Sequence, residues 1–516
     1  MQQKSQILGN CSSRPCHRTA VESNRMLQLG LCLSAGLLAV ILVMWGTVYA
    51  APQAIRYVDG TSGEDLSDCT NSSVPCATIG FALGLAEPGD TTYVAAGIYS
   101  ETLDLAKNVT LVGGFEAGGW TRDISANPTI LDGTGIVDSV FQISPGVDAT
   151  VEGFVVRNGT APGEGGAFFI NGATVVISAT IVRDNAAASH GGGIWLEGVS
   201  DLLLVNSTFL DNSAGERGGG LAASGSDAGS VIELRGVEVL GNTAVSDGGG
   251  LSLDSVPTFI TASLVLSNTS GASGGGIHGG ELQVISCEIR GNEANGPGSV
   301  FGGGIAMSPV GDNFLLVRDS VVSDNQAVGT TESIGGGINA ERSRATIERT
   351  IVRGNGALYN AGVSLYQTVL TMTNSSIVAN AGRGLSGEAT GSLVNVTVAD
   401  NQEVGVSVPI SGGLAITNSI LWGNAGTDYE CSTCTLAYSD VGVGDTTGTG
   451  NISQDPLFVD AAGGDYHLQA GSPCIHAGTP SGAPATDLEG TPRDAAPDMG
   501  AYEWQARIFL PLVLRY

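Results

Sequence analysis

Short runs of alternating apolar and polar residues recur along most of the chain, and each run ends at an asparagine that is followed by a glycine-rich turn. The segment FLDNSAGERGGGLAA, residues 209–223, shows the pattern, and similar segments begin at residues 182, 239, 265, 289 and 322. Alternation with a period of two residues is typical of β-strands. The pattern therefore predicts many short strands, each of which leads into an asparagine.

The asparagines are spaced like the coils of a solenoid, at intervals of 21 to 33 residues, which is too short for a propeller blade. The residue three positions before each asparagine is apolar, and the residue five before is mostly serine or threonine. Positions kept across coils of unequal length indicate side chains stacked in one interior. We therefore expect an asparagine ladder at a corner of the coil, formed by Asn158, Asn185, Asn212, Asn242, Asn268, Asn292, Asn325, Asn355, Asn380, Asn401 and Asn424.

Three adjacent glycines follow many of these asparagines, as at residues 218–220. A glycine-rich loop that binds phosphate opens a helix and has a lysine nearby, whereas these glycines precede another strand pattern. We interpret the triplets as turns between coils, after which Trp195 and, one coil earlier, Phe169 face outward. Two consecutive turns, residues 293–301 and 326–334, are longer than the others and are expected to form a local lip, where function commonly resides.

The repeats resemble those of right-handed parallel β-helix proteins, the group that includes pectate-lyase-like enzymes, and FLDNSAGERGGGLAA is also similar to repeats of chlamydial polymorphic outer-membrane proteins. The segment CATIGFALGLAEPGD resembles the capping segment of bacterial members, in which residues 78–86 would form a short helix. The segment DPLFVDAAGGDYHLQAGSPCIHAGTP resembles the end module of choice-of-anchor Q proteins. The resemblance implies an all-β, single-stranded right-handed parallel β-helix solenoid with a short N-terminal capping helix and a C-terminal cap module.

The sequence pattern and these resemblances together predict five parts of the chain. These are a leader at 1–50, an N-terminal cap at 51–90, the β-helix at 91–430, the choice-of-anchor Q-like module at 431–504 and an apolar tail at 505–516. The tail is too short to span a membrane as a helix. The two alternative interpretations of the tail are a sorting signal and a last strand.

The leader predicts export. Basic residues precede an uncharged segment, residues 26–55, whose apolar part ends near the small residue Ala50. These features are typical of a signal peptide, and an uncleaved membrane anchor is the alternative because the apolar run is long enough to span a bilayer. Both interpretations place the rest of the chain outside the cell or at its surface, and the membrane is contacted only through an uncleaved leader.

The chain is strongly acidic, with a formal net charge of −29 at pH 7. Such a surface repels nucleic acid and anionic membranes, so we expect no nucleic-acid partner. We expect no cofactor, with calcium as the alternative, because an acidic extracellular protein is suited to binding cations. We expect a monomer.

Six cysteines follow the leader, and four of them form close pairs near the two ends of the chain. In an exported protein, Cys69 with Cys76 and Cys431 with Cys434 are expected to form short-loop disulfides. The two ends of a solenoid are too far apart for these four to share a zinc ion. Cys287 occupies the serine and threonine position of its coil, so we expect it to be a buried free thiol.

Candidate catalytic residues are few. A pectin lyase needs calcium-binding carboxylates and a basic residue, and the only lysine after the leader is Lys107. Asp184 and Asp211 precede the ladder asparagine in consecutive coils, so they lie about one strand spacing apart, close to what a retaining glycosidase needs. That position is aspartate or glycine in eight of eleven coils, and turn geometry explains both residue types. We expect a structural role, with calcium binding or catalysis as the alternative.

A binding surface is a stronger expectation than a reaction centre. Phe169 and Trp195, outward-facing in neighbouring coils, could stack on sugar rings, although aromatic residues also stabilise a sheet by packing on each other. His190 and His278 stand beside glycine triplets three coils apart, which is too far for one catalytic pair. We expect both histidines to be exposed.

These observations predict an exported, capped β-helix displayed at or released from a bacterial surface, where it acts as an adhesin or carbohydrate-binding scaffold without catalysis. A polysaccharide or a cell-surface glycan is the expected partner. One alternative is a divergent polysaccharide lyase or glycoside hydrolase, and another is a structural surface-layer component. The fold does not choose among them, because function resides in sites and not in architecture.

Overall fold

The computed structural model describes residues 53–505, except residues 199, 225–228, 255, 312 and 445. The residues from Ala54 onward form one compact unit. The expected leader at 1–50 and the tail from residue 506 lie outside the described residues. Within the part that is described, no helix has the length and apolar character needed to cross a membrane.

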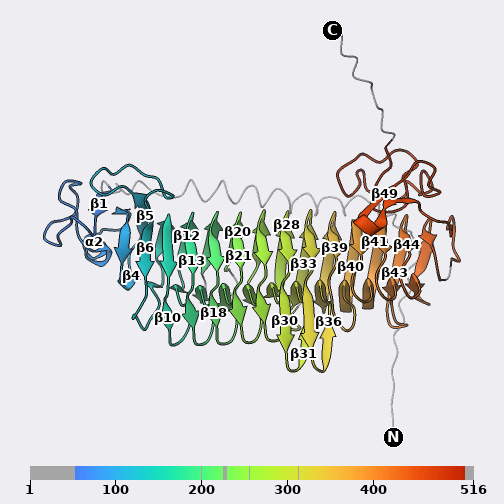
Figure 1. The fold of residues 1–516 in the computed structure, drawn as a ribbon, viewed down its shortest axis with the longest axis horizontal. Helices are drawn as coiled ribbons and strands as arrows, with labels where there is room; N and C mark the ends of the chain where they lie inside the picture. The colour runs from blue at the N-terminus through green and yellow to red at the C-terminus, as the bar shows by residue number, and fades with distance from the viewer. Residues whose placement is uncertain are drawn as a thin grey trace, which may run out of the picture. The chain divides into compact units, whose positions relative to one another are not determined.

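Almost all of the described secondary structure is β, and each strand pairs in parallel with the equivalent strand of the next coil (Figure 1). The fold is a right-handed parallel β-helix, as expected. Three faces run along it, and the first is the glycine-turn face, whose strands follow the glycine turns. It contains β4 (Leu103–Leu105), β7 (Phe141–Ile143), β11 (Phe168–Asn171), β15 (Ile194–Glu197), β19 (Leu221–Ser224), β23 (Leu251–Asp254), β27 (Ile277–Gly279), β32 (Ile305–Met307), β37 (Ile338–Glu341), β42 (Val406–Ser407) and β45 (Tyr429–Glu430).

The second, or middle, face contains β1 (Ile55–Val58), β2 (Thr91–Ala95), β5 (Val109–Phe115), β8 (Asp148–Glu152), β12 (Thr174–Ser178), β16 (Asp201–Val205), β20 (Ile232–Arg235), β24 (Thr258–Thr261), β28 (Glu281–Ile285), β33 (Asn313–Arg318), β38 (Ser343–Glu348), β43 (Gly413–Thr417) and β46 (Thr435–Ala437). The third, or asparagine, face contains β3 (Gly97–Tyr99), β6 (Thr129–Asp132), β9 (Phe154–Arg157), β13 (Ile181–Arg183), β17 (Thr208–Leu210), β21 (Glu238–Leu240), β25 (Leu264–Leu266), β29 (Glu288–Arg290), β34 (Val321–Ser323), β39 (Ile351–Arg353), β44 (Ile420–Trp422) and β47 (Asp440–Val441). Two long strands, β40 (Val363–Val378) and β41 (Leu385–Ala399), run through all three faces.

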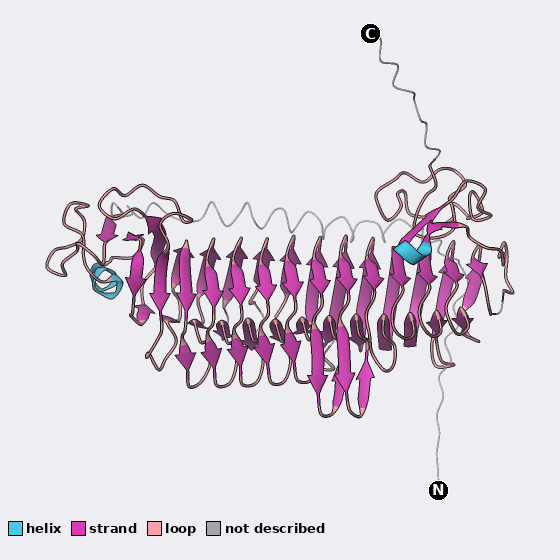
Figure 2. Cartoon of the chain, viewed as in Figure 1, coloured by secondary structure: helices cyan, strands magenta, loops and turns pink. Residues whose placement is uncertain are grey.

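A fourth, smaller sheet follows the ladder asparagines. It contains β10 (Thr160–Ala161), β14 (Ala186–Ala187), β18 (Ser213–Ala214), β22 (Thr243–Ala244), β26 (Thr269–Ser270), β30 (Glu293–Gly296) and β35 (Gln326–Gly329). The two long turns project beyond this sheet as β31 (Ser299–Phe301) and β36 (Glu332–Ile334), which pair in parallel (Figure 2). Ala294, Val300 and Ala327 form a small apolar cluster of their own there.

Apolar side chains fill the interior in stacks along the axis. Val182, Phe209 and Val239 occupy equivalent positions in successive coils and are fully buried. The rings of Phe141 and Phe168 stack with their centroids 4.5 Å apart. Burial of such stacks is the main term that favours folding, and the period-two pattern of the sequence encodes it.

The asparagine ladder holds the corner after the asparagine face. The side-chain oxygen of each member after Asn185 accepts hydrogen bonds from the backbone N–H and the side-chain amide of the asparagine in the preceding coil, for example Asn268 to Asn292 at 3.0 and 2.9 Å. The same amide also donates to a carbonyl oxygen of the preceding coil, as Asn292 does to Val265 at 2.8 Å. The last member, Asn424, donates to the carboxylate of Asp428 from its backbone N–H and its side-chain amide. The members are Asn185, Asn212, Asn242, Asn268, Asn292, Asn325, Asn355, Asn380, Asn401 and Asn424, all buried.

Asn158 does not belong to the ladder, so its expected place was wrong by one residue. Strand register aligns Asn158 with Asp184, and Gly159 takes the ladder position, where its N–H donates to Asn185. Asn158 has a φ of +57° and donates to Asp132. Asparagine favours both the left-handed corner and the ladder, which is why the sequence pattern does not separate the two positions.

Hydroxyl groups five residues before the asparagines form a second set of axial contacts. Each donates to the carbonyl oxygen two residues earlier, and several accept the N–H of the preceding coil. Cys287 takes this position as a free, buried cysteine whose thiol contacts the carbonyl oxygen of Ile285. Burial raises the pKa of the Cys287 thiol to about 11, so it stays protonated and unreactive at neutral pH.

The N-terminal end is closed by the short helix α2 (Ile79–Leu85). Thr78 accepts the N–H of Phe81, and the Glu101 carboxylate accepts the N–H groups of Ile79 and Gly80. These contacts satisfy donors that a helix N-terminus leaves free. A disulfide joins Cys69 to Cys76 beside this cap, and a second joins Cys431 to Cys434 in the last coil. This coil continues to β47, so strand pairing extends past residue 430.

The C-terminal module packs against the side of the last coils. Its hairpin, β48 (Phe458–Asp460) and β49 (Asp465–Leu468) joined by the 3-10 turn η1 (Ala461–Gly463), lies beside β41 and β44 (Figure 1). Its side chains bury Val378, Ala399 and Ile420. Three corner asparagines one strand ahead of the ladder, Asn374, Asn395 and Asn418, donate to backbone carbonyl oxygens of the module. These asparagines attach the module to the coils.

Replacing Asn292 with alanine tests the ladder. The backbone N–H and the side-chain amide of Asn268 would lose their acceptor inside the protein, at a cost of about 1–3 kcal/mol for each unsatisfied group. We expect a lower urea midpoint of unfolding. Asn295→Ala is the matched control, because Asn295 is exposed and hydrogen-bonds only to Glu293. Equal midpoints for the two variants would contradict the role of the ladder.

Replacing Asn395 with alanine tests how the module is held. Its buried amide donates to the carbonyl oxygens of Asp498 at 2.9 Å and Gly500 at 3.3 Å. We expect faster hydrogen exchange in residues 485–503, through a loss of about 1–3 kcal/mol. Asn206→Ala is the control, because Asn206 has the same left-handed backbone but is exposed and far from the module. Unchanged exchange in Asn395→Ala would show that apolar contacts suffice.

Candidate functional site

The residue before every ladder asparagine has a positive φ, between 54° and 71°. The residues are Asp184, Asp211, Gly241, Ser267, Gly291, Asp324, Gly354, Ala379, Asp400 and Gly423. Glycine adopts this conformation freely, and aspartate and asparagine tolerate it better than most other residues. Turn geometry therefore accounts for the aspartates and glycines at this corner.

Asp184 and Asp211 lie in neighbouring coils on this corner, and both are exposed. Asp184 is ion-paired with the adjacent Arg183. The Asp211 carboxylate lies over Gly241 of the next coil, where a Cβ atom would approach it to 2.4 Å. The structure thus places the two aspartates together as expected, but it gives them different partners and an open surface.

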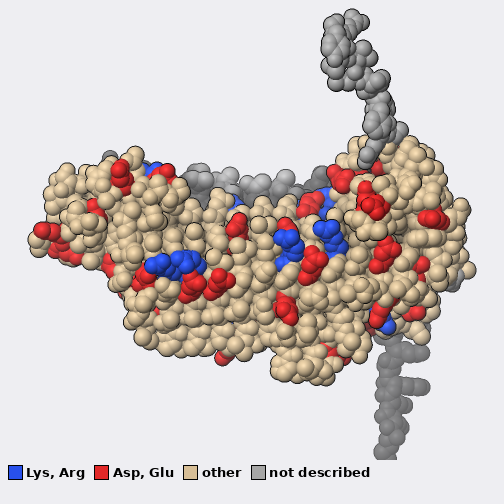
Figure 3. Space-filling model, in the orientation of Figure 1, with Lys and Arg blue, Asp and Glu red and all other residues tan. Residues whose placement is uncertain are grey.

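Other groups expected to carry chemistry have structural partners. Lys107 donates to the carbonyl oxygens of Gly84 and Ala86 at the end of α2, where a cation satisfies free carbonyl groups. In the described part of the chain, no three His, Cys, Asp or Glu side chains are grouped in a way that could hold a metal ion. On the face seen in Figure 3, acidic side chains are spread along the coils and the few basic ones lie next to them.

The glycine triplets fold back against the outer side of the glycine-turn face. Gly248, the first glycine of its triplet, has a φ of +65°, and a Cβ there would lie 2.2 Å from the carbonyl oxygen of Leu251 and 2.8 Å from Ser252. The residue before each triplet therefore stands over the outward side chains of the strand. The outward-pointing side chains of Ser252, His278, Asn339 and Ser364 are accordingly buried.

Phe169 and Trp195 face outward in register, as expected, but Trp195 is not an open platform. It is 8% exposed, and its ring stacks on His190 with the centroids 4.9 Å apart. Phe169 is half-buried. A sugar would have to displace His190 to stack on Trp195, so the expectation of an exposed aromatic surface at Trp195 is wrong.

A charged cluster lies on the same face, formed by Arg217, Asp247, Asp254 and His278, and is called here the His278 cluster. Arg217 contacts the carboxylates of Asp247 at 3.4 Å and Asp254 at 3.3 Å. The Nδ1 atom of His278 lies 3.3 Å from Asp254 Oδ1. These two atoms approach outside hydrogen-bond geometry, and both are buried without a hydrogen-bond partner among the described residues.

His278 is 5% exposed, so the expectation that it is exposed was wrong. Its strand partner in the preceding coil is Ser252. The sequence held a usable signal, because Arg217 and Asp247 occupy the position before the triplet in consecutive coils and Asp254 ends the next strand. The charges that surround His278 lie in these stacked columns, so the spacing between the two histidines alone does not reveal the cluster.

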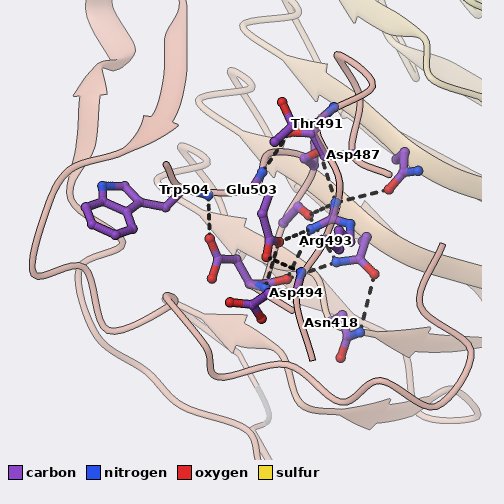
Figure 4. A network of polar contacts seen from close by, with 12 residues as sticks. Asn418, Asp487, Thr491, Arg493, Asp494, Glu503 and Trp504 are labelled. Atoms are coloured by element: carbon purple, nitrogen blue, oxygen red, sulfur yellow. Dashed lines mark hydrogen bonds and ion pairs between the residues drawn. The ribbon is translucent and has the colours of Figure 1, made fainter. Parts of the chain in front are cut away.

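The C-terminal module is organised around the buried guanidinium of Arg493 (Figure 4). Arg493 forms an ion pair with Glu503 at 3.0 Å and donates to Asn374 and to the carbonyl oxygens of Gly500 and Ala501. The Asp487 carboxylate accepts three backbone N–H groups, including that of Glu503. These side-chain contacts, and not regular strand pairing, hold the loops of the module in position.

Burial disfavours the charged form of two carboxyl groups, Asp440 in β47 and Asp498 in the C-terminal module. Asp440 accepts the N–H of Gln454 and the thiol of Cys474, and burial raises its pKa to about 6. Burial likewise raises the pKa of Asp498 to about 6. Cys474 is a free, buried cysteine. The thiol of Cys474 thus supplies a donor to Asp440.

Comparison with known proteins shows a likeness in fold only. No protein-family model matches the chain, and no curated protein matches it. Among solved structures, it is similar to pectate lyase Pel9A, with 14% identity over 89% of this chain and 98% of the other and a TM-score of 0.28. It is also similar to XylC in complex with xylose, with 9% identity, coverage of 87% and 98%, and a TM-score of 0.36. At these values no activity is transferred, and the strand registers carry the fold assignment.

The pKa of Asp440 predicts a pH dependence of stability. Its folded pKa of about 6 lies above the ordinary value of 3.8 for an aspartate, so the folded state binds more protons between these values. The stability that the neutral carboxyl contributes is present at low pH and is lost as pH rises through about 6. Two pKa units correspond to about 3 kcal/mol.

Asp440→Asn tests this dependence, because the amide oxygen can still accept the N–H of Gln454 while carrying no charge. We expect the variant to lose less stability than the parent protein between pH 4.5 and 7.5 in urea unfolding. Asp184→Asn, at an exposed aspartate, is the control and should follow the parent protein. A parallel pH profile for Asp440→Asn would contradict the assignment.

Proposed function

We propose that the protein is an exported scaffold that binds a polysaccharide or cell-surface glycan along its glycine-turn face and does not cleave it. The observation that carries the proposal is the His278 cluster. Buried polar atoms without partners cost free energy, and such atoms are expected where a ligand completes the hydrogen bonds. A sugar hydroxyl suits this place, because it can donate to Asp254 and also hydrogen-bond to His278.

The shape of the face supports a long ligand. Equivalent positions repeat at the spacing of parallel strands, about 4.8 Å, which is close to the advance of one sugar ring in an extended glycan. Equivalent positions along this face carry polar side chains, those of Ser252, His278, Asn339 and Ser364. A rigid array of this kind pre-organises the binding site and lowers the entropy cost of binding.

Binding without cleavage is favoured by the ion pairs of the cluster. Arg217 contacts both Asp247 and Asp254, so each carboxylate already has a cationic partner. Asp184 and Asp211 lie on an open corner, on another face. A divergent polysaccharide lyase or hydrolase remains the alternative, and it would use His278 as the base.

Export through the leader and retention through the choice-of-anchor Q-like C-terminal module belong to the same proposal. The two disulfides support an extracellular location, because such bonds persist in oxidising compartments. In this role the molecule is a monomer that displays its long faces at or near the cell surface.

A panel of neutral and acidic polysaccharides tests the proposal. We expect the purified protein to bind at least one of them in affinity electrophoresis without releasing reducing ends or unsaturated products. His278→Ala should weaken binding by about tenfold or more, the effect of losing one hydrogen bond to a charged or buried group. Asp184→Asn with Asp211→Asn is the control and should bind like the parent protein.

Three other outcomes would contradict this proposal or relocate the site. Product release that is lost in His278→Ala would establish the enzyme alternative. Binding that survives in His278→Ala would move the site away from the cluster. A protein that binds no member of the panel would favour a structural surface-layer role.

A further inference from the structure

A cleft of about 640 Å³ opens in the C-terminal module, between the β48–β49 hairpin and the segments 487–491 and 503–505. This volume lies within the range of small-molecule sites. The side chains that line it include His467, Gln469, Glu489, Thr491 and Trp504. No lysine or arginine is among the described lining residues. The cleft is far along the chain from the His278 cluster and shares no residue with it.

The inner wall of the cleft carries excess negative charge. Asp487 and Glu503 line it, and both are buried and held by backbone N–H groups. The guanidinium of Arg493, which is not part of the lining, forms an ion pair with Glu503 and donates to the backbone carbonyl oxygen of Asp498. One positive charge thus accompanies the two carboxylates of the wall, so the wall favours a cationic ligand.

The rim adds two more carboxylates around one histidine. Asp465 contacts Nδ1 of His467 at 2.6 Å, and Glu489 contacts Nε2 at 3.3 Å. The side chain of Glu489 is 58% exposed, so it can turn toward a ligand. The histidine ring packs on Tyr502, with the centroids 4.1 Å apart.

Tyr502 is buried behind this histidine. Burial raises the pKa of its hydroxyl, the charges of Glu489, Asp465 and Asp487 raise it as well, and the charge of Arg353 lowers it. The hydroxyl therefore lies near the carboxylates that surround the cleft.

We propose that this cleft binds an amino sugar, a hexosamine residue with a free ammonium group. The ammonium group pairs with Glu489, and the indole ring of Trp504, half-buried at the edge of the cleft, packs on the apolar face of the sugar ring. The side-chain carbonyl of Gln469 and the hydroxyl of Thr491 have no partners among the described residues and receive the sugar hydroxyls. An N-acetylated sugar lacks the charge, and a uronic acid is repelled.

Isothermal titration calorimetry of the full chain tests the proposal with three ligands of equal length. These are an oligomer of glucosamine, its N-acetylated counterpart and an oligomer of glucose. We expect binding to the glucosamine oligomer, with affinity at least about tenfold above the other two, the typical effect of one charge-assisted contact. Glu489→Gln and Trp504→Ala should each weaken binding by a similar factor.

The controls separate this site from the glycine-turn face. Glu288→Gln removes an exposed carboxylate that pairs with Arg290 outside the cleft, and it should leave the affinity unchanged. His278→Ala should also leave it unchanged, even if it abolishes polysaccharide binding at the other site. Thermal unfolding of each variant confirms that the module is folded.

Three results would overturn the amino-sugar site. They are equal affinity for the acetylated oligomer, full affinity in folded Glu489→Gln and Trp504→Ala, and no binding of the glucosamine oligomer. None of them bears on the polysaccharide proposal, which depends on His278. A parent protein that binds the glucosamine oligomer but no member of the polysaccharide panel would overturn only the polysaccharide proposal.

Discussion

The asparagine ladder is the interaction on which the coils depend, because it satisfies buried polar groups that no strand pairing reaches. At the corner after the asparagine face the backbone turns out of one sheet toward the next, and its N–H groups lie inside the protein. Each side-chain oxygen of the ladder accepts two donors from the coil before it, as Asn292 does from Asn268. The ladder fixes the position of this corner in every coil. The length of the turn that follows is then free to vary, which is why coils of 21 to 33 residues share one core.

The architecture and most of the interior could be predicted from the sequence, because both depend on periodicity. Stacked columns of Val182, Phe209 and Val239, the hydroxyl position taken by Cys287 and the helix beginning at Thr78 all follow from spacing and local residue preference. Asn158 was misplaced by one residue because two adjacent corner positions favour the same residue type. Periodicity assigns a side chain to the inside or the outside of a coil, but it does not say what covers the outside.

That limit explains the errors at the candidate site. Trp195 and His278 do point outward, yet the glycine triplets fold back over them, and this depends on the φ of +65° at glycines such as Gly248. The repeat pattern also does not predict how the C-terminal module packs on the coils. The contacts join segments more than 100 residues apart, as in the hydrogen bond from Asn395 to Asp498. The one signal for this packing in the sequence was the second asparagine column, which contains Asn374, Asn395 and Asn418. The module and the glycine-turn face thus carry two different chemical surfaces, one with small polar groups and the other with carboxylates.

The end of the ladder has a consequence for the last coil. Every asparagine both accepts hydrogen bonds and passes an amide to the next coil, so a ladder that ended at Asn424 would leave two buried donors unpaired. Asp428 accepts both donors at 2.8 and 2.7 Å and, as a carboxylate, has no amide to pass on. Its second carboxylate oxygen accepts the N–H of Val443. One buried carboxylate therefore both ends the series and ties the chain that follows, up to Val443, to the corner.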